Sequence, residues 1–360
     1  MPAPISITTN WTDERIDEII DVRSPAEFAE DHIPGAINLP VFSNEERAEI
    51  GTIYKQQSPF LARRKGAALV SQNIASHIHS HLHNRPENWR PLIHCWRGGQ
   101  RSRAFAHICA EIGWACFLLE GGYKHYRGQV LDGLREVPST LSVIIIGGKT
   151  GVGKTHLLHA IQKAGGQIID LEGLAHHKGS LLGADPERPQ PAQRYFESHL
   201  FDIMRRFDRT KPIFIEAESS RVGDIAIPKE LWHMMGDAPA IEIEANSSLR
   251  LKMLKSDYPH LMNTEAADLH KLIDGMTKRY GKETTSKWRH DLQNNDFDGL
   301  ITQLLNDHYD PSYERTSKLH DRLVIDRFDL GHGSADDFMS IAQKSISAGL
   351  DYLANQDNHK

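Results

Sequence analysis

The chain has 360 residues, a formal net charge of −6, and 39% hydrophobic and 25% charged residues, which is the composition of an ordinary globular protein. This length is too great for one average domain and suits two domains that each bury a core. The longest apolar run, LSVIIIGG, cannot span a bilayer, and the N-terminus lacks a basic segment followed by a hydrophobic one. We therefore expect a cytoplasmic protein that makes no membrane contact.

The first 135 residues alternate between strand-like and helical segments. Residues 17–41 predict a short strand, a Ser-Pro turn, a helix and a second short strand. Residues 67–83 predict a helix, and RPLIHC predicts a buried strand that ends at a cysteine. The next helix should place Ala104, Ile108 and Ile112 on its inner side. This pattern indicates a parallel-sheet α/β domain over residues 1–135.

A second α/β domain begins at LSVIIIGGKTGVGKTHLLHAI, which joins a β-branched strand, a glycine-rich loop and an amphipathic helix. Further strand-like runs are GQIID, KPIFIEAESS and AIEIEAN. We assign residues 136–246 to a P-loop NTPase-like α/β domain and residues 247–360 to its mostly helical C-terminal part.

The segment GKTGVGKT satisfies the phosphate-loop pattern G-x-x-x-x-G-K-[ST] and has the required strand before it and helix after it. Gly148, Gly151 and Gly153 allow backbone N–H groups to turn inward, and Lys154 adds a full positive charge. Thr155 stands where such loops bind Mg²⁺. The motif predicts a phosphate site but does not separate a nucleoside triphosphate from another diphosphate.

Acidic residues follow two strands of the second domain. Glu216 and Glu218 face the same side of the strand in IFIEAESSRVG, where a carboxylate that orients a metal ion or water is expected. Asp170 and Glu172, with His176, form a second candidate polar cluster, because parallel strands end at the same edge of a sheet. The alternative is an acidic strand terminus at the domain surface.

The chain has three cysteines, Cys95, Cys109 and Cys116, without a paired spacing, which argues against a disulfide framework and a structural zinc site. Cys109 and Cys116 lie on helix and strand faces and are expected to fill the core. Cys95 ends a strand, so we predict a reactive thiol there.

The residues after Cys95 are suited to binding an anion. Gly98 and Gly99 permit inward-facing amides, which lower the pKa of a thiol and bind an oxyanion. Arg101 is expected over the same anion, and Arg97 adds positive potential. These residues leave open whether the thiolate attacks phosphorus or carries a chalcogen atom.

Two resemblances bear on that choice. HCWRGGQRS matches H-C-x5-R-[ST] and resembles the loop of cysteine-dependent phosphatases, whose thiolate attacks phosphorus. DVRSPAEFAEDHIPGAINLP and LLEGGYKHY resemble the opening and closing segments of rhodanese domains, which carry sulfur or selenium on cysteine. The loop is one residue longer than that of many sulfurtransferases, which favours a phosphate-sized ligand. A chalcogen donor that itself bears a phosphate would reconcile the two.

The order of motifs resembles the tRNA 2-selenouridine synthase family over roughly residues 15–320. The segments that carry this resemblance are GTIYKQQSPFLARRKGAALVSQNIA, HCWRGGQRS, GGKTGVGKT, DLEGLAHHKGSLLG and IFIEAESSRVG. The resemblance implies that a 2-thiouridine at the tRNA wobble position is alkylated by geranyl diphosphate, and that selenium from selenophosphate then replaces the S-geranyl group.

The resemblance also implies roles for residues of this chain. Cys95 would be the active cysteine that holds selenium as a selenosulfide, with Arg101 on the phosphate. Gly148–Thr155 would hold geranyl diphosphate rather than ATP. No cofactor would be tightly bound, Mg²⁺ binding stays open, and the acceptors would be the lysine, glutamate and glutamine tRNAs. The alternatives are a cysteine phosphatase fused to a kinase-like P-loop domain, and a non-catalytic rhodanese scaffold that regulates an NTPase.

A tRNA substrate requires a basic surface on this acidic chain. Residues 250–290 hold nine lysines and arginines against five acids, with two aromatic residues available for stacking. These basic and aromatic residues include Lys278, Arg279, Tyr280, Lys282, Lys287, Trp288 and Arg289. Arg63, Arg64 and Lys65 form a second cluster. The histidine run HIHSHLH lies at a helix end, where alternate side chains diverge, so no metal site is predicted there.

Overall fold

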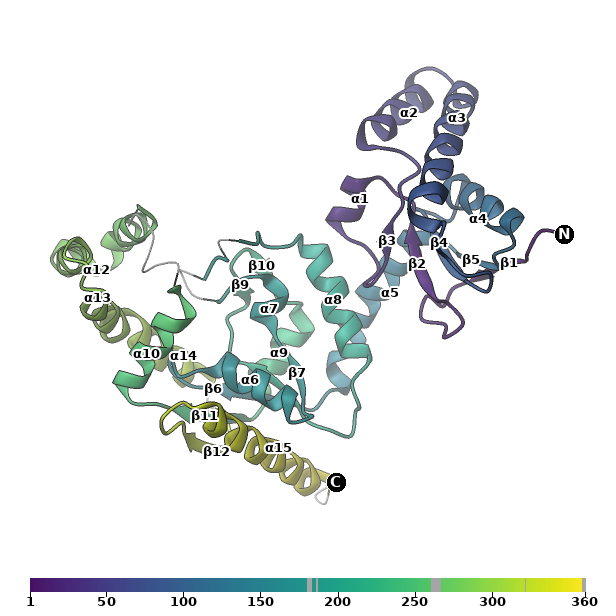
Figure 1. The fold of residues 1–360 in the computed structure, drawn as a ribbon. Coiled ribbons are helices and arrows are strands. Elements are labelled where there is room, and N and C mark those ends of the chain that lie inside the picture. Colours follow the sequence, from purple (N-terminus) through teal and green to yellow (C-terminus); the bar gives the residue numbers. More distant parts are fainter. Residues whose placement is uncertain (180–182, 186, 260–266, 321, 358–360) are drawn as a thin grey trace. The chain divides into compact units, whose positions relative to one another are not determined.

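The computed structural model describes residues 1–179, 183–185, 187–259, 267–320 and 322–357. The chain forms two compact units (Figure 1). The N-terminal unit contains Met1–Arg135 and Pro191–Asp202, and the C-terminal unit contains Glu136–Gln190 and Ile203–Lys360. In the described part of the chain, no helix combines the length and apolar character that crossing a bilayer requires.

The N-terminal unit is built on a five-stranded parallel sheet with the order β1-β5-β4-β2-β3. Its strands are β1 (Ile5–Thr8), β2 (Glu18–Asp21), β3 (Ile37–Asn38), β4 (Pro91–His94) and β5 (Cys116–Leu119). Its helices are α1 (Pro25–Glu30), α2 (Asn44–Gln56), α3 (Pro59–His77), η1 (Ile78–Leu82), α4 (Gln100–Ile112) and α5 (Gly122–Glu136). The predicted α/β domain with a parallel sheet is confirmed.

The core of this unit lies between the sheet and the helices that flank it. Helix α4 buries Phe105, Ala106 and Cys109, whereas Ile108 and Ile112 are 38% and 48% exposed. The predicted inner stripe of α4 was therefore wrong for Ile108 and Ile112, although Ala104 packs against the core. Phe105 and Cys109 occupy the side that faces the core, and each lies one residue, about 100° of helix rotation, beyond Ala104 and Ile108. Cys109 and Cys116 are buried, as expected of core cysteines.

Residues 191–202 rejoin the N-terminal unit as the first part of α8 (Gln193–Arg205). Gly133 of α5 permits this approach, because a Cβ there would lie 2.1 Å from Cε2 of Phe201. Ser198 also donates a hydrogen bond to Oδ2 of Asp31 at 3.0 Å. The sequence boundary at residue 135 did not anticipate this return.

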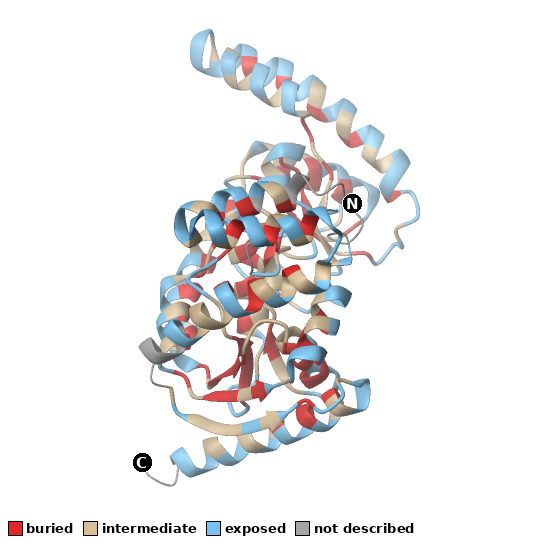
Figure 2. Ribbon diagram, turned by 90° about the vertical axis from the view of Figure 1, so that its left-hand side faces the viewer, coloured by how far each residue is buried: buried red, intermediate tan, exposed pale blue. Residues whose placement is uncertain are grey.

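The C-terminal unit contains a second five-stranded parallel sheet, with the order β12-β11-β6-β8-β7. Its strands are β6 (Val143–Gly147), β7 (Gln167–Ile169), β8 (Ile213–Glu216), β11 (Ala240–Glu244) and β12 (Val324–Asp329), and β9 (Arg221–Val222) and β10 (Ile225–Ala226) form a separate antiparallel pair. The central strands are buried (Figure 2). The region after residue 247 is mostly helical, as predicted, but it also contains strand β12. Sequence reasoning missed this strand because its partly exposed VIDRFD pattern lacks the continuous apolar run of the central strands.

The helices of this unit are η2 (Pro138–Thr140), α6 (Lys154–Lys163), α7 (Leu171–Ala175), α9 (Lys229–Asp237), α10 (Ser247–Asp257), α12 (Ala267–Gln293), α13 (Phe297–Leu304), η3 (Leu305–Tyr309), α14 (Asp310–His320) and α15 (Ala335–Asp357). Helices α12 and α13, with η3, surround a small core of their own that includes Ile273, Trp288 and Leu300. The order of α/β domain, phosphate loop and helical C-terminal part thus agrees with the predicted fold class.

Candidate functional sites: a thiol loop and a phosphate loop

Cys95 follows the buried strand β4, and α4 begins five residues later at Gln100. The intervening loop packs tightly against the turn between β5 and α5. Gly98 has φ +65°, and a Cβ there would lie 2.8 Å from the carbonyl oxygen of Leu119. A Cβ on Gly122, at φ +59°, would lie 2.3 Å from the carbonyl oxygen of Cys95. Glycine at both positions is therefore needed to hold the loop in this path.

Cys95 is 3% exposed, and its sulfur accepts two hydrogen bonds. The backbone N–H of Gly99 donates to Sγ at 3.2 Å, and the hydroxyl of Ser102 donates at 3.3 Å. Burial raises the pKa of the Cys95 thiol, but the hydrogen bond from Ser102 and the charge of Arg101 outweigh burial and leave the pKa below its ordinary value. The loop therefore stabilises a thiolate.

Arg101, Gly99 and Arg97, which were also predicted around Cys95, differ in their contacts and exposure. Arg101 donates from Nη1 to Oε2 of Glu27 at 3.1 Å, so a carboxylate holds the guanidinium beside the loop. Gly99 caps α4 and provides an amide, whereas Arg97 is exposed. Sequence reasoning assigned no role to Ser102, although the last position of H-C-x5-R-[ST] already indicated a hydroxyl there.

Replacing Ser102 with alanine is expected to raise the pKa of the Cys95 thiol, because the thiolate loses its side-chain hydrogen bond. Alkylation by iodoacetamide, followed against pH by mass spectrometry of the Cys95 peptide, should show its midpoint shifted to higher pH and a several-fold slower rate at pH 7. Ser71→Ala, on the exposed face of α3, is the matched control. Coincident profiles for the two variants would remove Ser102 from this role.

The phosphate loop runs from Gly148 to the start of α6 at Lys154. Gly151 and Gly153 have φ values of +81° and +84°, which orient the intervening amides inward. The ammonium group of Lys154 donates to the carbonyl oxygen of Gly148 at 3.0 Å. The structure thus brings together the residues that the motif predicted.

Two contacts that sequence reasoning missed brace this loop from the helical region. Arg250 of α10 donates to the carbonyl oxygen of Thr150 at 2.9 Å and forms a bidentate pair with Asp310 of α14, at 2.6 and 3.0 Å. Tyr313 accepts a hydrogen bond from the N–H of Gly148 at 2.9 Å and donates to Glu242 at 2.9 Å. Residues about 100 or more positions away in sequence form these braces, so no local motif reveals them.

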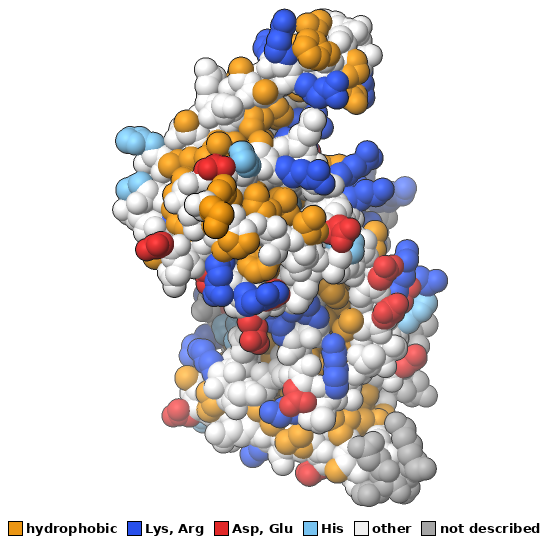
Figure 3. Space-filling model, turned by 90° about the vertical axis from the view of Figure 1, so that its right-hand side faces the viewer, with side chains coloured by type: hydrophobic (Ala, Val, Ile, Leu, Met, Phe, Trp, Pro, Cys, Tyr) orange, Lys and Arg blue, Asp and Glu red, His pale blue; other side chains and the backbone are white. Residues whose placement is uncertain are grey.

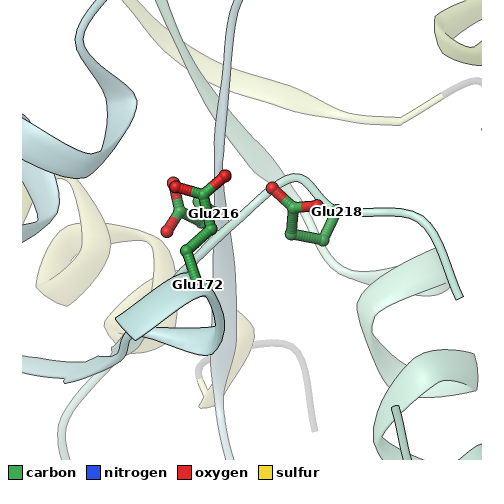
Figure 4. A group of neighbouring side chains, drawn as sticks. All are labelled: Glu172, Glu216 and Glu218. Atoms are coloured by element: carbon green, nitrogen blue, oxygen red, sulfur yellow. The ribbon is translucent and has the colours of Figure 1, made fainter. Parts of the chain in front are cut away.

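Three carboxylates meet beside Thr155. Ligand oxygens of Glu172, Glu216 and Glu218 lie within 4.8 Å of one another (Figure 4). The hydroxyl of Thr155 donates to Glu216 at 2.9 Å and to Glu172 at 3.2 Å. The two acidic groups predicted from separate strands therefore form one cluster. Asp170 instead caps α7 by accepting from Gly173 N at 2.7 Å, outside this cluster.

Burial and mutual repulsion oppose full ionisation of the three carboxyls. Burial and the charge of Glu218 raise the pKa of Glu172 to about 8. Burial and the charge of Glu216 raise the pKa of Glu218 to about 7, and burial with the charge of Glu172 raises that of Glu216 well above its ordinary value. Oε1 of Glu216 is buried without a hydrogen-bond partner among the described residues. Such a cluster either keeps protons at neutral pH or binds a cation, and its oxygen ligands suit Mg²⁺.

The phosphate loop and the carboxylates line one cavity of about 820 Å³. Its wall also includes apolar and aromatic side chains, among them Leu254, Tyr309, Tyr313 and Val324. His176 lines it as well, with Nδ1 3.1 Å from the carbonyl oxygen of Pro189. The cavity can therefore accept a ligand that has an anionic end and an apolar body.

The aromatic residues predicted for stacking on tRNA pack on the small core of the helical region. Trp288 is fully buried and its indole N–H lies 3.3 Å from Asp307. Tyr280 packs against the same small core and its hydroxyl is hydrogen-bonded to His308. The prediction was therefore wrong for Trp288, whose ring fills the core of the helical region, whereas Tyr280 is only partly buried. Of the basic residues, Lys287 pairs with Glu283 and Arg289 with Asp274, while Lys278, Arg279 and Lys282 are exposed.

Comparisons with known proteins cover both units. Residues 8–129 match the model of the rhodanese-like domain, and residues 141–345 match that of the "tRNA 2-selenouridine synthase AAA domain". The tRNA 2-selenouridine synthase of Sulfurovum sp. is 31% identical over 82% of this chain and 87% of that protein. The chain belongs to the tRNA 2-selenouridine synthase family.

Two further relatives are similar to this chain over two thirds of its length or more. The tRNA 2-selenouridine synthase of Marinobacter nauticus is 33% identical over 82% of this chain and 87% of its own length. That of Bdellovibrio bacteriovorus is 37% identical over 67% of this chain and 64% of its own length. The family resemblance predicted from the motifs is confirmed, and in this synthase-family chain it includes both the thiol loop and the phosphate loop.

Proposed function

We propose that this chain converts 2-thiouridine at the wobble position of tRNA into 2-selenouridine through an S-geranyl intermediate. Geranyl diphosphate and selenophosphate are the co-substrates, and the lysine, glutamate and glutamine tRNAs are the acceptors. The name of these relatives, tRNA 2-selenouridine synthase, supports the overall conversion. The chain is accordingly a transferase that modifies tRNA.

One observation carries the proposal: a stabilised thiolate occurs in one chain of this family with a phosphate loop whose cavity has apolar as well as charged side chains in its wall. A two-step exchange needs two activated donors, and both proposed donors carry phosphate groups. Alkylation of the thiocarbonyl sulfur also has a clear chemical purpose, because it turns a poor leaving group into a neutral thiol.

In the first step, the sulfur of 2-thiouridine attacks C1 of geranyl diphosphate, the C–O bond breaks, and diphosphate leaves, while the base releases its N3 proton and becomes S-geranyl-2-thiouridine. Lys154 and the inward-facing amides of the phosphate loop bind the diphosphate and stabilise its growing charge. Leu254 and Val324 offer apolar surface to the geranyl chain. Thr155 with Glu172, Glu216 and Glu218 would hold Mg²⁺, which would neutralise part of the diphosphate charge.

In the second step, selenium replaces the S-geranyl group and requires Cys95. Two roles for this thiolate differ in whether the phosphorus of selenophosphate changes its oxidation state. A selenosulfide formed directly from selenophosphate leaves phosphorus two electrons more reduced than in phosphate. Attack of the thiolate on phosphorus instead forms S-phosphocysteine and releases hydrogen selenide, with no change in oxidation state. The hydrogen bonds from Gly99 and Ser102 to Sγ stabilise the thiolate required in either case.

We expect the purified chain, supplied with 2-thiouridine tRNA, geranyl diphosphate and selenophosphate, to produce 2-selenouridine that nucleoside mass spectrometry detects. Without selenophosphate, S-geranyl-2-thiouridine should accumulate. Absence of both nucleosides with folded, tRNA-binding protein would refute the proposal. Rapid turnover of aryl phosphates at Cys95, with unmodified tRNA, would favour a cysteine phosphatase fused to a kinase-like domain.

A further inference from the structure

Outside the two loops, the most distinctive feature of the chain is a basic segment without acidic residues. Residues 50–86 contain Lys55, Arg63, Arg64, Lys65 and Arg85 and not one aspartate or glutamate, in a chain whose net charge is −6. We call residues 50–86 the basic arm. It comprises the second half of α2, all of α3, and η1.

The basic arm has a capped end with exposed apolar side chains at the turn between α2 and α3. Side chains of Tyr54, Phe60 and Leu61 are 56%, 63% and 38% exposed there. Ser58 accepts hydrogen bonds from the N–H groups of Phe60 and Leu61, at 3.2 and 3.5 Å, and Pro59 begins α3. Because the turn is capped, its aromatic rings are presented on a fixed frame.

Basic residues lie close to these rings in the sequence. Arg63 and Arg64 are exposed and have no carboxylate partner in the described part of the chain, whereas Lys65 pairs with Glu49. Figure 3 shows Lys and Arg side chains beside hydrophobic ones at the top of the view, which is the α2–α3 end in Figure 1. Arginine with an exposed aromatic ring is the combination that binds phosphates and stacks on unpaired bases.

The rest of α3 makes RNA a better partner than a lipid surface. Its buried side packs on the unit through Ala62, Gly66, Val70 and Ile74. Its exposed side carries small or polar residues, including Ser71, Gln72 and Ser76. A helix that lies in a membrane needs a continuous apolar outer face, which α3 lacks. The backbone of a nucleic acid can lie close to small polar residues on this face.

We propose that the basic arm is a tRNA-docking surface, with Arg63 and Arg64 on phosphates and Phe60 stacked on an unpaired base. This inference rests on the proposed function, since it assigns a binding surface to the tRNA of that reaction. It replaces the stacking role predicted for Trp288, which is buried. The exposed His79 and His81 extend the same acid-free segment along η1.

The test compares binding of fluorescein-labelled 2-thiouridine tRNA to the full chain by anisotropy. Arg63→Glu/Arg64→Glu is expected to weaken binding at least about ten-fold near 100 mM salt, and to reduce the salt-dependence slope by about 1.5. Phe60→Ala should weaken binding about ten-fold. The matched control, Lys229→Glu/Lys344→Glu, removes the same charge from exposed positions of the C-terminal unit and should bind like wild type. Thermal unfolding should show that all variants fold.

Steady-state modification gives the second readout. The arginine variant should raise the KM for tRNA about ten-fold with kcat nearly unchanged. If the arginine variant binds tRNA within two-fold of the control, the basic-arm proposal is overturned. Product formation by the wild type would at the same time leave the proposed function intact. Failure of wild type to bind tRNA would overturn both. Wild-type binding to phosphatidylglycerol vesicles that the arginine variant loses, with tRNA binding unchanged, would assign the basic arm to a membrane instead.

Discussion

Replacement of Cys95 with serine is expected to reduce the rate of 2-selenouridine formation by roughly a thousand-fold or more, while S-geranyl-2-thiouridine accumulates. Serine keeps the size of the side chain and can hydrogen-bond with Gly99 and Ser102, so the loop should keep its path. Its hydroxyl is not ionised at neutral pH, and the nucleophile is therefore lost. Geranylation continues because the phosphate loop does not use the thiol.

The measurement is nucleoside mass spectrometry of tRNA digests after incubation with both co-substrates. Cys109→Ala is the matched control, because Cys109 is a buried core cysteine with a pKa raised by its hydrogen bond with Cys116 and by burial. It should retain both steps. Loss of geranylation together with selenation in Cys95→Ser would contradict the division of labour between the two loops.

Labelled selenophosphate would also distinguish the two roles of Cys95 in the wild-type chain. Phosphorus-32 retained on the Cys95 peptide after rapid denaturation indicates S-phosphocysteine. Selenium-75 on that peptide indicates a selenosulfide, and the phosphorus product would then be phosphite, or phosphate if a two-electron oxidant takes part. The Cys95→Ser chain should retain neither label.

The sequence predicted the thiol loop and the phosphate loop because each depends on local geometry. Glycines, a strand before the loop and a helix after it fix the path of the backbone within about ten residues. Cys95, Gly99, Lys154 and Thr155 were therefore identified correctly as neighbours in two loops. The two parallel sheets were predicted for the same reason, from strands and helices that alternate along the chain.

What the sequence did not reveal depends on contacts between distant segments. Arg250 and Asp310 are 60 positions apart, and together they brace a loop that begins about 100 residues before Arg250. Trp288 was placed on the surface because its neighbours are charged, yet the kink of α12 at Gly281 and the packing of α13 enclose it. Strand β12 is partly exposed at the edge of its sheet, which weakens its apolar pattern.

Replacement of Lys154 with alanine is expected to reduce geranylation about 100-fold or more, because the phosphate loop loses the full charge that stabilises the departing diphosphate. In the structure, Nζ of Lys154 reaches back to the carbonyl oxygen of Gly148, which places the ammonium group inside the loop. Selenation from ordinary 2-thiouridine tRNA should fall to the same extent, because its intermediate is no longer formed.

The decisive measurement supplies S-geranyl-2-thiouridine tRNA directly, together with selenophosphate. Lys154→Ala should then form 2-selenouridine at nearly the wild-type rate, whereas Cys95→Ser should not. Lys163→Ala, at the exposed end of the same helix, is the matched control and should retain both steps. Unchanged geranylation in Lys154→Ala would move the diphosphate to another part of the chain. Loss of selenation from the preformed intermediate would mean that the phosphate loop also binds selenophosphate, so that both donors depend on Lys154.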